Sequence, residues 1–455
     1  MKFLYFFAIC LSLTPKVDAQ YISKSQAVAD IDYYNKALFE VHYNPYLYIS
    51  KGAYKIITDS LKNSIADSVL VKSFTMLMSR LTSSIKDGHT MPTIVQQIFK
   101  SDFKKNIFFP LELVADNDYN IYLPIQNEQF NIPPGALITS VNDVDMQGFY
   151  KKASSMIGGL SSYQKEMAIN LIGNFLYLSD VKPPFKVQYR YEGKRNSIVI
   201  QAGITLKECL AKALPQVNNQ KFEFEIKENK IGYLSLNTME PDFETYTAFF
   251  DSCFTVLKSK KINTMVIDLR KNLGGNSQIA DLLISYFNYK PYSLSGGRFW
   301  RVSQKYKDFL TAQGDTSNSY HKKANNTILD YRKCGPHKPI FLDNKLLFTG
   351  KVYLITGPLT FSSANMLADG VKEYHMATVI GQPTGENTND FGEGYLMELP
   401  NSKLKIQTTT TFDLGVDCDP DINHAVIPEK LIETSLKNKI YRSDPVISYI
   451  LQTVR

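Results

Sequence analysis

The sequence predicts an α/β fold built in three parts, and three observations carry this prediction. Apolar residues recur at helical spacing from Ile22 to about Lys86, and short β-rich runs follow from Phe108 to about Ala202. From about Phe222 onward, strand patterns alternate with helix patterns. Such alternation is typical of a layered structure with largely parallel strands. The third part is therefore expected to hold the main sheet.

The first part, residues 20–90, is expected to be a small helical domain. Two stretches, DIDYYNKALFEVHYNPYLY and SLKNSIADSVLVKSFTMLMSRLTSSI, carry apolar residues at three- and four-residue intervals. Pro45 is expected to interrupt the first helix, because proline lacks the backbone N–H and its ring clashes with the preceding turn. The domain ends in a polar turn at residues 86–90.

The middle part, residues 105–205, is expected to be β-rich. The run from Gly135 to Met146 resembles the segment of PDZ domains in which a strand passes through a turn into a short strand and a helix. Asn142-Asp143 has the composition of that turn. PDZ domains pair an edge strand with a peptide. An ordinary small β-rich insertion is the alternative interpretation.

The third part, residues 222–440, contains the alternation. KIGYLSL, NTMVIDLR, KVYLITG and MATVIG read as strands, and FETYTAFFDSCFTVLKSK and IADLLISYF read as helices. Residues 293–342, rich in polar side chains, Tyr and Lys, interrupt the pattern and are too long for a simple connection, so an accessory or functional loop is expected there. Residues 441–455 are expected to close the chain as an amphipathic helix.

The composition is that of a soluble globular protein, and the start of the chain predicts export. Of 455 residues, 44% are hydrophobic and 21% are charged, and the net charge of +7 comes with no basic run interleaved with aromatics, which argues against nucleic-acid binding. A charged start, an apolar run and small residues before Gln20 predict a signal peptide, residues 1–19. A short membrane anchor is the alternative, but the run ends at Pro15 and no later stretch is long enough to span a bilayer. A secreted or periplasmic location is expected.

Cysteine and histidine spacing gives no metal motif. The four cysteines that follow the predicted cleavage site are scattered, and no H-E-x-x-H occurs, so no metal or cofactor is expected. Export permits disulfides, and buried thiols are equally compatible with the pattern. The four are Cys209, Cys253, Cys334 and Cys418.

Two serines stand where a predicted strand passes into a helix. The strand pattern of Val352 to Ile355 is followed by a turn at residues 356–358, and helical spacing begins near Met366. Ser362 and Ser363 thus lie beside the free N–H groups of a helix start, where a nucleophile and its oxyanion can be held. A plain N-cap is the alternative interpretation.

Two other features can complete such a site. Gly274-Gly275 follows a predicted buried strand, so its bare N–H groups can form an oxyanion loop, or merely a turn into the next helix. His89 is one of six histidines, and it follows Gly88 at the boundary between two predicted domains, where clefts form.

Four segments in this order resemble the C-terminal processing (tail-specific) protease family of serine peptidases, especially its tricorn-core and retinoid-binding-protein-like branch. They are DGHT at 87–90, VIDLRKNLGG at 266–275, LTFSSANMLADGVKEYHMATVIGQPTGEN at 359–387 and AVIPE at 425–429. The resemblance spans most of the chain. It implies an α/β, ClpP/crotonase-like catalytic core behind the helical N-terminal domain and the PDZ-like module.

The resemblance also implies roles for individual residues. Ser362 matches the nucleophile, and the amides of Ser363, Gly274 and Gly275 match the oxyanion hole. In the processing-protease branch a lysine base stands where this chain has Asn387, whose amide cannot take a proton.

The tricorn-like branch instead uses an early histidine, which His89 matches, although Gly88 stands where that branch often has serine. This branch adds an acid just before the tail motif. Asp419 and Asp421 are the nearest candidates, a solvated turn is the alternative for them, and Glu386 and Glu393 flank the same region and can serve instead.

These matches predict a secreted serine endopeptidase that acts on proteins or peptides through an acyl-enzyme. A non-catalytic binding protein for a lipophilic or peptide ligand is the alternative, since 28 Tyr and 27 Phe allow such a cavity. A crotonase-like acyl-CoA enzyme is a third. The sequence leaves the oligomeric state open.

Overall fold

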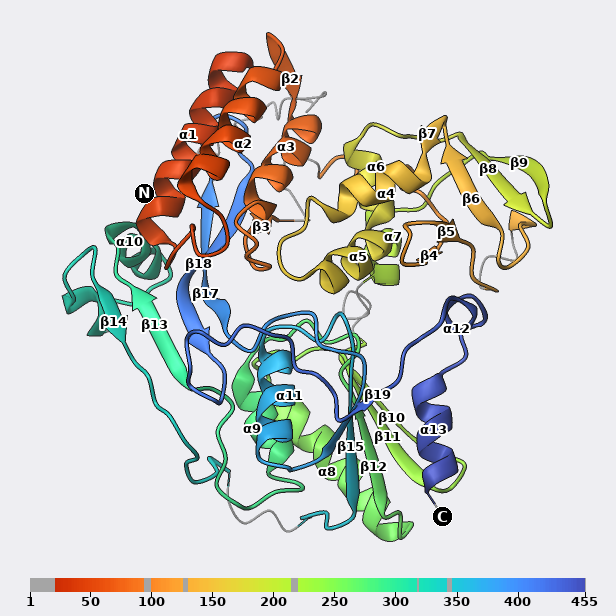
Figure 1. Ribbon diagram of the computed structural model, residues 1–455, viewed down its shortest axis with the longest axis vertical. Helices are drawn as coiled ribbons and strands as arrows, with labels where there is room; N and C mark the ends of the chain where they lie inside the picture. Colours follow the sequence, from red (N-terminus) through yellow and green to blue (C-terminus); the bar gives the residue numbers. More distant parts are fainter. Residues whose placement is uncertain are drawn as a thin grey trace, which may run out of the picture.

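The computed structural model describes residues 21–93, 100–125, 130–213, 220–316, 319–341 and 346–454. The predicted signal peptide, residues 1–19, lies outside the described residues. In Figure 1 a helical domain and a β-rich module stand above the α/β core, and a second sheet joins the helical domain to that core. Within the described ranges, no helix is both long enough and apolar enough to cross a membrane.

The helical domain holds α1 (Lys24–Val41), α2 (Lys51–Ser64) and α3 (Val71–Ser83). Helix α1 ends at Val41, with His42 as its C-cap, ahead of Pro45. The second predicted helix is in fact two, because β2 (Ser68–Leu70) pairs with β1 (Tyr21–Ser23) between α2 and α3. Backbone pairing with a distant segment has therefore overridden the local helical spacing.

The β-rich module confirms the PDZ-like prediction in its central motif. Strand β6 (Leu137–Val141) turns through Asn142-Asp143, both at positive φ, into β7 (Val144–Asp145) and α4 (Met146–Ser154). A two-residue hairpin turn with φ > 0 at both positions matches the twist of its strands. The sheet order is β4-β5-β6-β8-β9, with α5 to α7 packed beside it. The remaining bounds are β4 Val114–Ala115, β5 Ile121–Tyr122, β8 Phe185–Tyr191, β9 Lys194–Ile200, α5 Ser161–Asn170, α6 Ile172–Leu178 and α7 Leu206–Ala213.

The core confirms the predicted alternation of strands and helices. Its sheet has the order β10-β11-β12-β15-β16-β19, in which only the β10–β11 pair is antiparallel. Helices α8, α9 and α11 cover one face and α13 covers the other, so neighbouring residues of β12 such as Met265 and Val266 belong to different cores. The bounds are β10 Phe222–Lys227, β11 Ile231–Leu236, β12 Thr264–Asp268, β15 Lys351–Thr356, β16 Thr378–Gly381, β19 Lys430–Leu431, α8 Phe243–Ser259, α9 Ser277–Ile284, α11 Ser363–Glu373, α12 Leu436–Tyr441 and α13 Pro445–Thr453.

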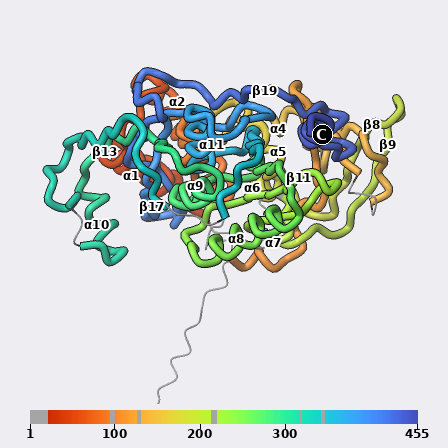
Figure 2. Tube along the Cα trace, turned by 90° about the horizontal axis from the view of Figure 1, so that it is seen from below, coloured from red at the N-terminus to blue at the C-terminus, as the bar shows by residue number. Residues whose placement is uncertain are grey.

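A second sheet, in the order β14-β13-β18-β17, brings the early part of the chain to the core. Strand β3 (Met91–Pro92), which directly follows the 87–90 turn, pairs with β18 (Lys405–Leu414). The predicted insertion, residues 293–342, supplies β13 (Gly297–Arg301), α10 (Gln304–Ala312), the short 3-10 helix η4 (Ser319–Lys322) and β14 (Ile328–Asp330), and it is thus more than a loop. Strand β17 (Asp390–Glu398) completes the sheet. In Figures 1 and 2 this sheet and β8–β9 lie at opposite ends of the molecule.

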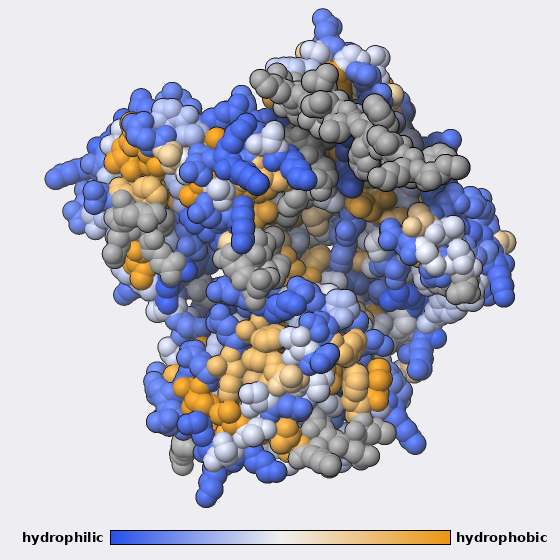
Figure 3. Space-filling model, turned by 180° about the vertical axis from the view of Figure 1, so that it is seen from behind, coloured by the Kyte–Doolittle hydropathy of each residue, from blue (hydrophilic) through white to orange (hydrophobic). Residues whose placement is uncertain are grey.

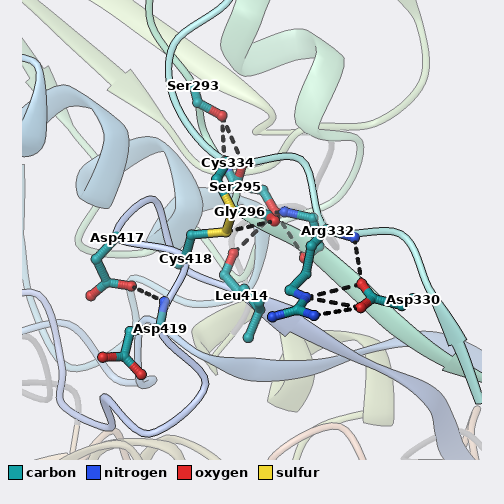
Figure 4. The surroundings of a disulfide bond; sticks show 12 residues. Ser293, Ser295, Gly296, Asp330, Arg332, Cys334, Leu414, Asp417, Cys418 and Asp419 are labelled. Atoms are coloured by element: carbon teal, nitrogen blue, oxygen red, sulfur yellow. Dashed lines mark hydrogen bonds and ion pairs between the residues drawn. A yellow bond between two sulfur atoms is a disulfide. The ribbon is translucent and has the colours of Figure 1, made fainter.

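The structure settles the question of the cysteines. Cys334 and Cys418 form a disulfide, while Cys209 and Cys253 are buried free thiols. Figure 4 shows the disulfide beside Gly296 and Leu414, where the insertion enters β13 and β18 ends. It therefore fastens the insertion to the segment that leads to the tail motif. Seen from behind, the surface is mostly hydrophilic with scattered apolar patches (Figure 3).

Candidate active site

Ser362 lies at the junction of β15 and α11 in a strained backbone conformation. Its φ is 52° and its ψ is −130°, and its side chain makes no capping hydrogen bond to the helix. A non-glycine residue at positive φ costs energy and persists only where the surroundings enforce it. The N-cap interpretation therefore fails for the side chain of Ser362, whose hydroxyl is left for other contacts.

Hydrogen bonds on both sides of the turn enforce this conformation. The N–H of Phe361 donates to the carbonyl of Asn272 at 3.1 Å, and the Thr360 hydroxyl donates to the carbonyl of Leu269 at 2.9 Å. The N–H of Gly385 donates to the carbonyl of Thr360 at 3.0 Å. The serine turn is thus fixed to the end of β12 and to the loop before β17.

The backbone amides of Gly275 and Ser363 can form an oxyanion hole. No acceptor among the described residues is bonded to either N–H, and the Ser363 hydroxyl donates to the carbonyl of Gly275 at 2.6 Å, which ties the two segments together. The N–H of Gly274, by contrast, donates to Oδ1 of Asn272 at 2.8 Å. Of the three predicted amide donors, Gly274 is thus already engaged within its own turn.

Gly274 has a packing role instead. Its φ is +96°, and a Cβ there would stand 2.7 Å from Cβ of Ser362 and 2.9 Å from the nitrogen of Ser363. A side chain at this position would push the glycine loop away from the serine turn. Glycine is therefore needed for the close approach of the two segments.

His89 is brought to the serine by the pairing of β3 with β18. Its ring lies against Phe361, the residue before Ser362, with 4.8 Å between ring centroids. A Cβ on Gly88 would approach the Phe361 ring to 2.7 Å. Glycine in place of the serine common in the tricorn-like branch is thus what lets Phe361 pack under His89.

His89 and Ser362 line the same cavity, which has a volume of about 330 Å³. Gly275, Ser363, Met366, Arg298, Glu393 and Asp413 also face it. The structure therefore gathers the predicted nucleophile, the predicted base and two amide donors in one cleft. A second cavity of about 220 Å³ lies beside it and shares Asp390 and Phe391 with it, and Asp87 and Glu386 line this second cavity.

Glu386 connects the serine and the histidine. Its Oε2 accepts the N–H of Ser362 at 2.5 Å, and its Oε1 lies 3.3 Å from Nδ1 of His89. Burial raises the pKa of Glu386, while the attraction of His89 and hydrogen bonds from Asp390 and from the Ser362 amide act in the opposite direction. This buried residue is one of the two acids, with Glu393, that the sequence offered as substitutes for Asp419 and Asp421.

The other predicted site residues lie elsewhere. Asp419 and Asp421 are solvent-exposed, neither forms an ion pair with His89, and the Asp419 carboxylate accepts the N–H of Asp421 at 2.9 Å in a local turn. Glu393 lines the cleft wall, where its carboxylate accepts a hydrogen bond from the Tyr306 hydroxyl at 2.9 Å. The carbonyl of Asn387 accepts a hydrogen bond from the Asn365 side chain at 2.7 Å, which ties α11 to the Glu386 loop.

Asp87 and His42 are two site residues that the sequence reasoning did not single out. Oδ1 of Asp87 accepts the N–H of His89 at 2.7 Å, and Oδ2 accepts hydrogen bonds from His42 Nε2 at 3.3 Å and from Thr409 at 2.9 Å. Burial raises the pKa of Asp87, but the hydrogen bonds from His42 and Thr90 and the attraction of His42 and His89 lower it to about 2. An aspartate before a glycine is typical of such a turn, whereas nothing in the sequence pointed to His42.

No group of three or more His, Cys, Asp or Glu side chains in the described part of the chain is arranged as a metal site. The chemistry of the cleft is that of a hydroxyl, an imidazole, a carboxylate and two amides. This set matches the requirements of acyl transfer by a serine nucleophile.

Comparisons with known proteins agree with this geometry. Residues 230–413 match the model of peptidase family S41. The structure of mature CPAF superposes with a TM-score of 0.64 at 14% identity, over 94% of this chain and 96% of that chain. Mature CPAF complexed with lactacystin gives a TM-score of 0.63 at 14% identity, over 94% and 97%. No curated protein sequence matches the chain.

The structural match supports a ClpP-like core with a PDZ-like module, and the family match covers the segments that hold Ser362 and the glycine loop. Over residues 230–413 the chain is therefore similar to peptidase family S41, and this similarity supports a serine-type peptidase.

Proposed function

We propose that this protein is a secreted endopeptidase in which Ser362 is the nucleophile, His89 the general base and Glu386 the acid that orients His89. One observation carries the proposal: the Glu386 carboxylate contacts both the backbone N–H of Ser362 and Nδ1 of His89. A single buried group thus holds the nucleophile and the base in one cleft. The 3.3 Å contact is an ion-pair distance, and Nδ1 of His89 has no hydrogen-bond partner among the described residues. A proton held on Nδ1 beside this carboxylate leaves the lone pair on Nε2 for the serine proton.

The reaction follows from these positions. Nε2 of His89 takes the proton of the Ser362 hydroxyl as the oxygen bonds to the carbonyl carbon of the peptide. The negative oxygen of the tetrahedral intermediate is held by the amides of Gly275 and Ser363, and each such donor contributes about 100- to 1,000-fold to the rate. His89 then gives its proton to the leaving amine as the C–N bond breaks, and water activated by His89 hydrolyses the ester.

A charged cleft wall favours a peptide over a lipophilic ligand. Arg298, Glu393 and Asp413 face the cavity beside Ser362, and Arg298 pairs with both acids, at 3.4 Å and 3.0 Å. Burying an apolar ligand against paired charges would strip them of water without compensation. The carrier function that the sequence left open has no comparable support.

The predicted signal peptide and the Cys334–Cys418 disulfide support a location outside the cytoplasm. Disulfides persist in oxidising compartments and are rare in the cytosol. Mass spectrometry of the protein from periplasmic and culture fractions should find a mature chain that starts at Gln20. A full-length chain in the cytosol would contradict this part of the proposal.

A fluorophosphonate probe tests the nucleophile. We expect wild type to be labelled, Ser362→Ala to lose labelling completely, and His89→Ala to be labelled at least about 100-fold more slowly. Ser363→Ala is the matched control, because it removes the adjacent hydroxyl and keeps the amide. Labelling that survives in Ser362→Ala and disappears in Ser363→Ala would transfer the nucleophile to the neighbouring serine.

A further inference from the structure

Three buried carboxyl groups lie next to one another behind His89. Asp390 on β17 stands directly opposite Asp413 on β18, and Glu386 precedes β17 in the same loop. Their exposed fractions are 7% for Glu386 and 8% for each aspartate. Three acids at this depth cannot all be ionised without partners, because burial penalises each charge and the charges repel.

Arg298 and His89 each lie beside one of the two acids other than Asp390. Arg298 stands opposite Asp413 on the neighbouring strand β13, with 3.0 Å between its Nε and Oδ1 of Asp413. His89 lies 3.3 Å from Glu386. Within the described part of the chain no cation pairs with Asp390. Its carboxyl group lies near enough to that of Glu386 for a shared hydrogen bond to lower the pKa of Glu386 and raise that of Asp390.

A hydrogen bond between two carboxyl groups requires one proton, since an ionised carboxylate only accepts. Of the two, Glu386 faces an imidazole and accepts a backbone N–H, both of which stabilise its charge. The charges that act on the Asp390 carboxyl group are those of other acids, namely Glu386, Asp413 and Asp87. The proton therefore belongs on Asp390, in an O–H···O⁻ bond of the strong, charge-assisted kind.

We propose that Asp390 is a positioning residue that stays protonated at neutral pH and donates a hydrogen bond to Glu386, so that Glu386 remains ionised and directed at His89. This inference rests on the proposed function, because it concerns the acid of that catalytic group. Burial, with the neighbouring Glu386 and Asp413 carboxylates, raises the pKa of Asp390 well above its usual range, in agreement with the geometry.

The proton can be located without any assay of activity. An infrared difference spectrum at pH 7 between wild type and Asp390→Asn should contain the carbonyl band of one protonated carboxylic acid, lost in the variant. The Glu386→Gln difference spectrum should lack such a band. A band that disappears in Glu386→Gln and persists in Asp390→Asn would place the proton on Glu386 and overturn the proposal.

Stability against pH gives a second, independent readout. An acid whose folded pKa is raised binds its proton more tightly when folded, so the contribution of Asp390 to wild-type stability is lost as the pH rises from about 4, the unfolded pKa, toward the folded value. Asp390→Asn does not titrate. Relative to wild type, its folding equilibrium constant should improve by about tenfold per pH unit across that window. A ratio that stays flat from pH 4 to 8 would show that Asp390 is ionised in the folded protein.

The activities of two Asp390 variants then distinguish a residue that positions Glu386 from one that only stabilises the fold. The amide of Asp390→Asn can still donate to Glu386, whereas the similar-sized Asp390→Leu cannot. We expect kcat to fall about 10- to 100-fold in the Leu variant with little change in KM, and the Asn variant to restore most of that loss. Equal losses in both variants would contradict the donor role. Should Ser362→Ala leave turnover intact, the proposed function fails, while the infrared and stability results still decide the protonation of Asp390.

Discussion

Two acid-rich regions of this protein differ sharply in what surrounds them. The turn that holds Asp417, Asp419 and Asp421 is exposed, and its carboxylates bond mainly to neighbouring backbone N–H groups. The cluster around His89 is buried and bonds across four segments that are far apart in the sequence. Nearness to the tail motif favoured the first region, yet the second supplies the acid beside the histidine. Burial and partners, which only the fold creates, decide which carboxylates are positioned.

The same contrast recurs inside the buried cluster. Asp87 and Asp390 are both deeply buried, but the pKa of Asp87 is lowered to about 2 and that of Asp390 is raised. Asp87 is surrounded by donors, from His42, Thr90, Thr409 and the His89 backbone, whereas Asp390 is surrounded by other acids. Deep burial alone therefore does not determine whether a carboxyl group is charged. The neighbouring groups, donors around Asp87 and acids around Asp390, determine it.

The largest expected effect comes from exchanging one acid in each region for its amide. Glu386→Gln should lower kcat by about 100- to 10,000-fold, because the neutral amide does not stabilise the positive charge of the imidazolium. Asp421→Asn is the matched control in the exposed turn and should stay within about twofold of wild type. Steady-state hydrolysis of a casein-type protein substrate measures both. A large loss in Asp421→Asn with a small one in Glu386→Gln would reverse the comparison.

A smaller effect is expected when the disulfide that links the exposed acidic turn to the 293–342 insertion is removed. The Cys334–Cys418 bond closes a loop with a sequence separation of 84 residues. Replacing both cysteines with serine should cost about 2–4 kcal/mol of unfolding free energy, mainly through the freedom that the unfolded chain gains. Denaturant unfolding of the wild type and the double variant measures this loss.

If the exposed turn and the active-site cleft are coupled, removing the disulfide should also lower the rate of hydrolysis. Because the disulfide contacts neither His89 nor Ser362, we expect the initial rate at low temperature to fall less than about threefold. Cys209→Ser is the control for the loss of a thiol alone. A stable double variant with a rate more than 100-fold reduced would show that the tail segment shapes the cleft.

Much of the fold could be predicted because the spacing of apolar residues along the chain indicates many of its helices and strands. The helices near 243–259 and 445–453 and the strands near 264–268 and 351–356 follow from apolar spacing. The split of the second predicted helix, between α2 and α3, could not be seen, because it depends on β1 some forty residues away in the sequence. The strands inside the insertion were missed for the same reason, since β13 forms by pairing with β18.

The site divides in the same way. Ser362, His89 and the glycine loop carry motifs that a single sequence displays, and the structure brings these segments together in one cleft. The acid carries no such motif, so the sequence left four candidates, of which Glu386 lies beside His89. Asp390 and His42 act through other side chains, and nothing local marks such a residue.

The smallest expected effect is the pH-dependent contribution of Asp87 to stability. A carboxyl group whose folded pKa of about 2 lies below its unfolded value stabilises the fold above that unfolded value. This contribution is lost as the pH falls from about 4 toward 2. Lowering the pKa of this buried carboxyl group to about 2 corresponds to about 2 kcal/mol of stability. The stability gap between wild type and Asp87→Asn should therefore be widest near pH 7 and narrow by that amount at low pH.

Urea unfolding at pH 2, 3, 5 and 7 measures this gap, with Asp417→Asn as the exposed control that should show almost none. The amide of Asp87→Asn also turns an N–H group toward the donors of His42 and Thr409, so part of its cost persists at every pH. Only the pH-dependent part reports the charge. A gap that stays constant from pH 2 to 7 would mean that Asp87 is neutral in the folded protein, and the contrast with Asp390 would then disappear. A narrowing gap for Asp87→Asn beside a widening advantage for Asp390→Asn would establish two neighbouring buried acids held in opposite charge states.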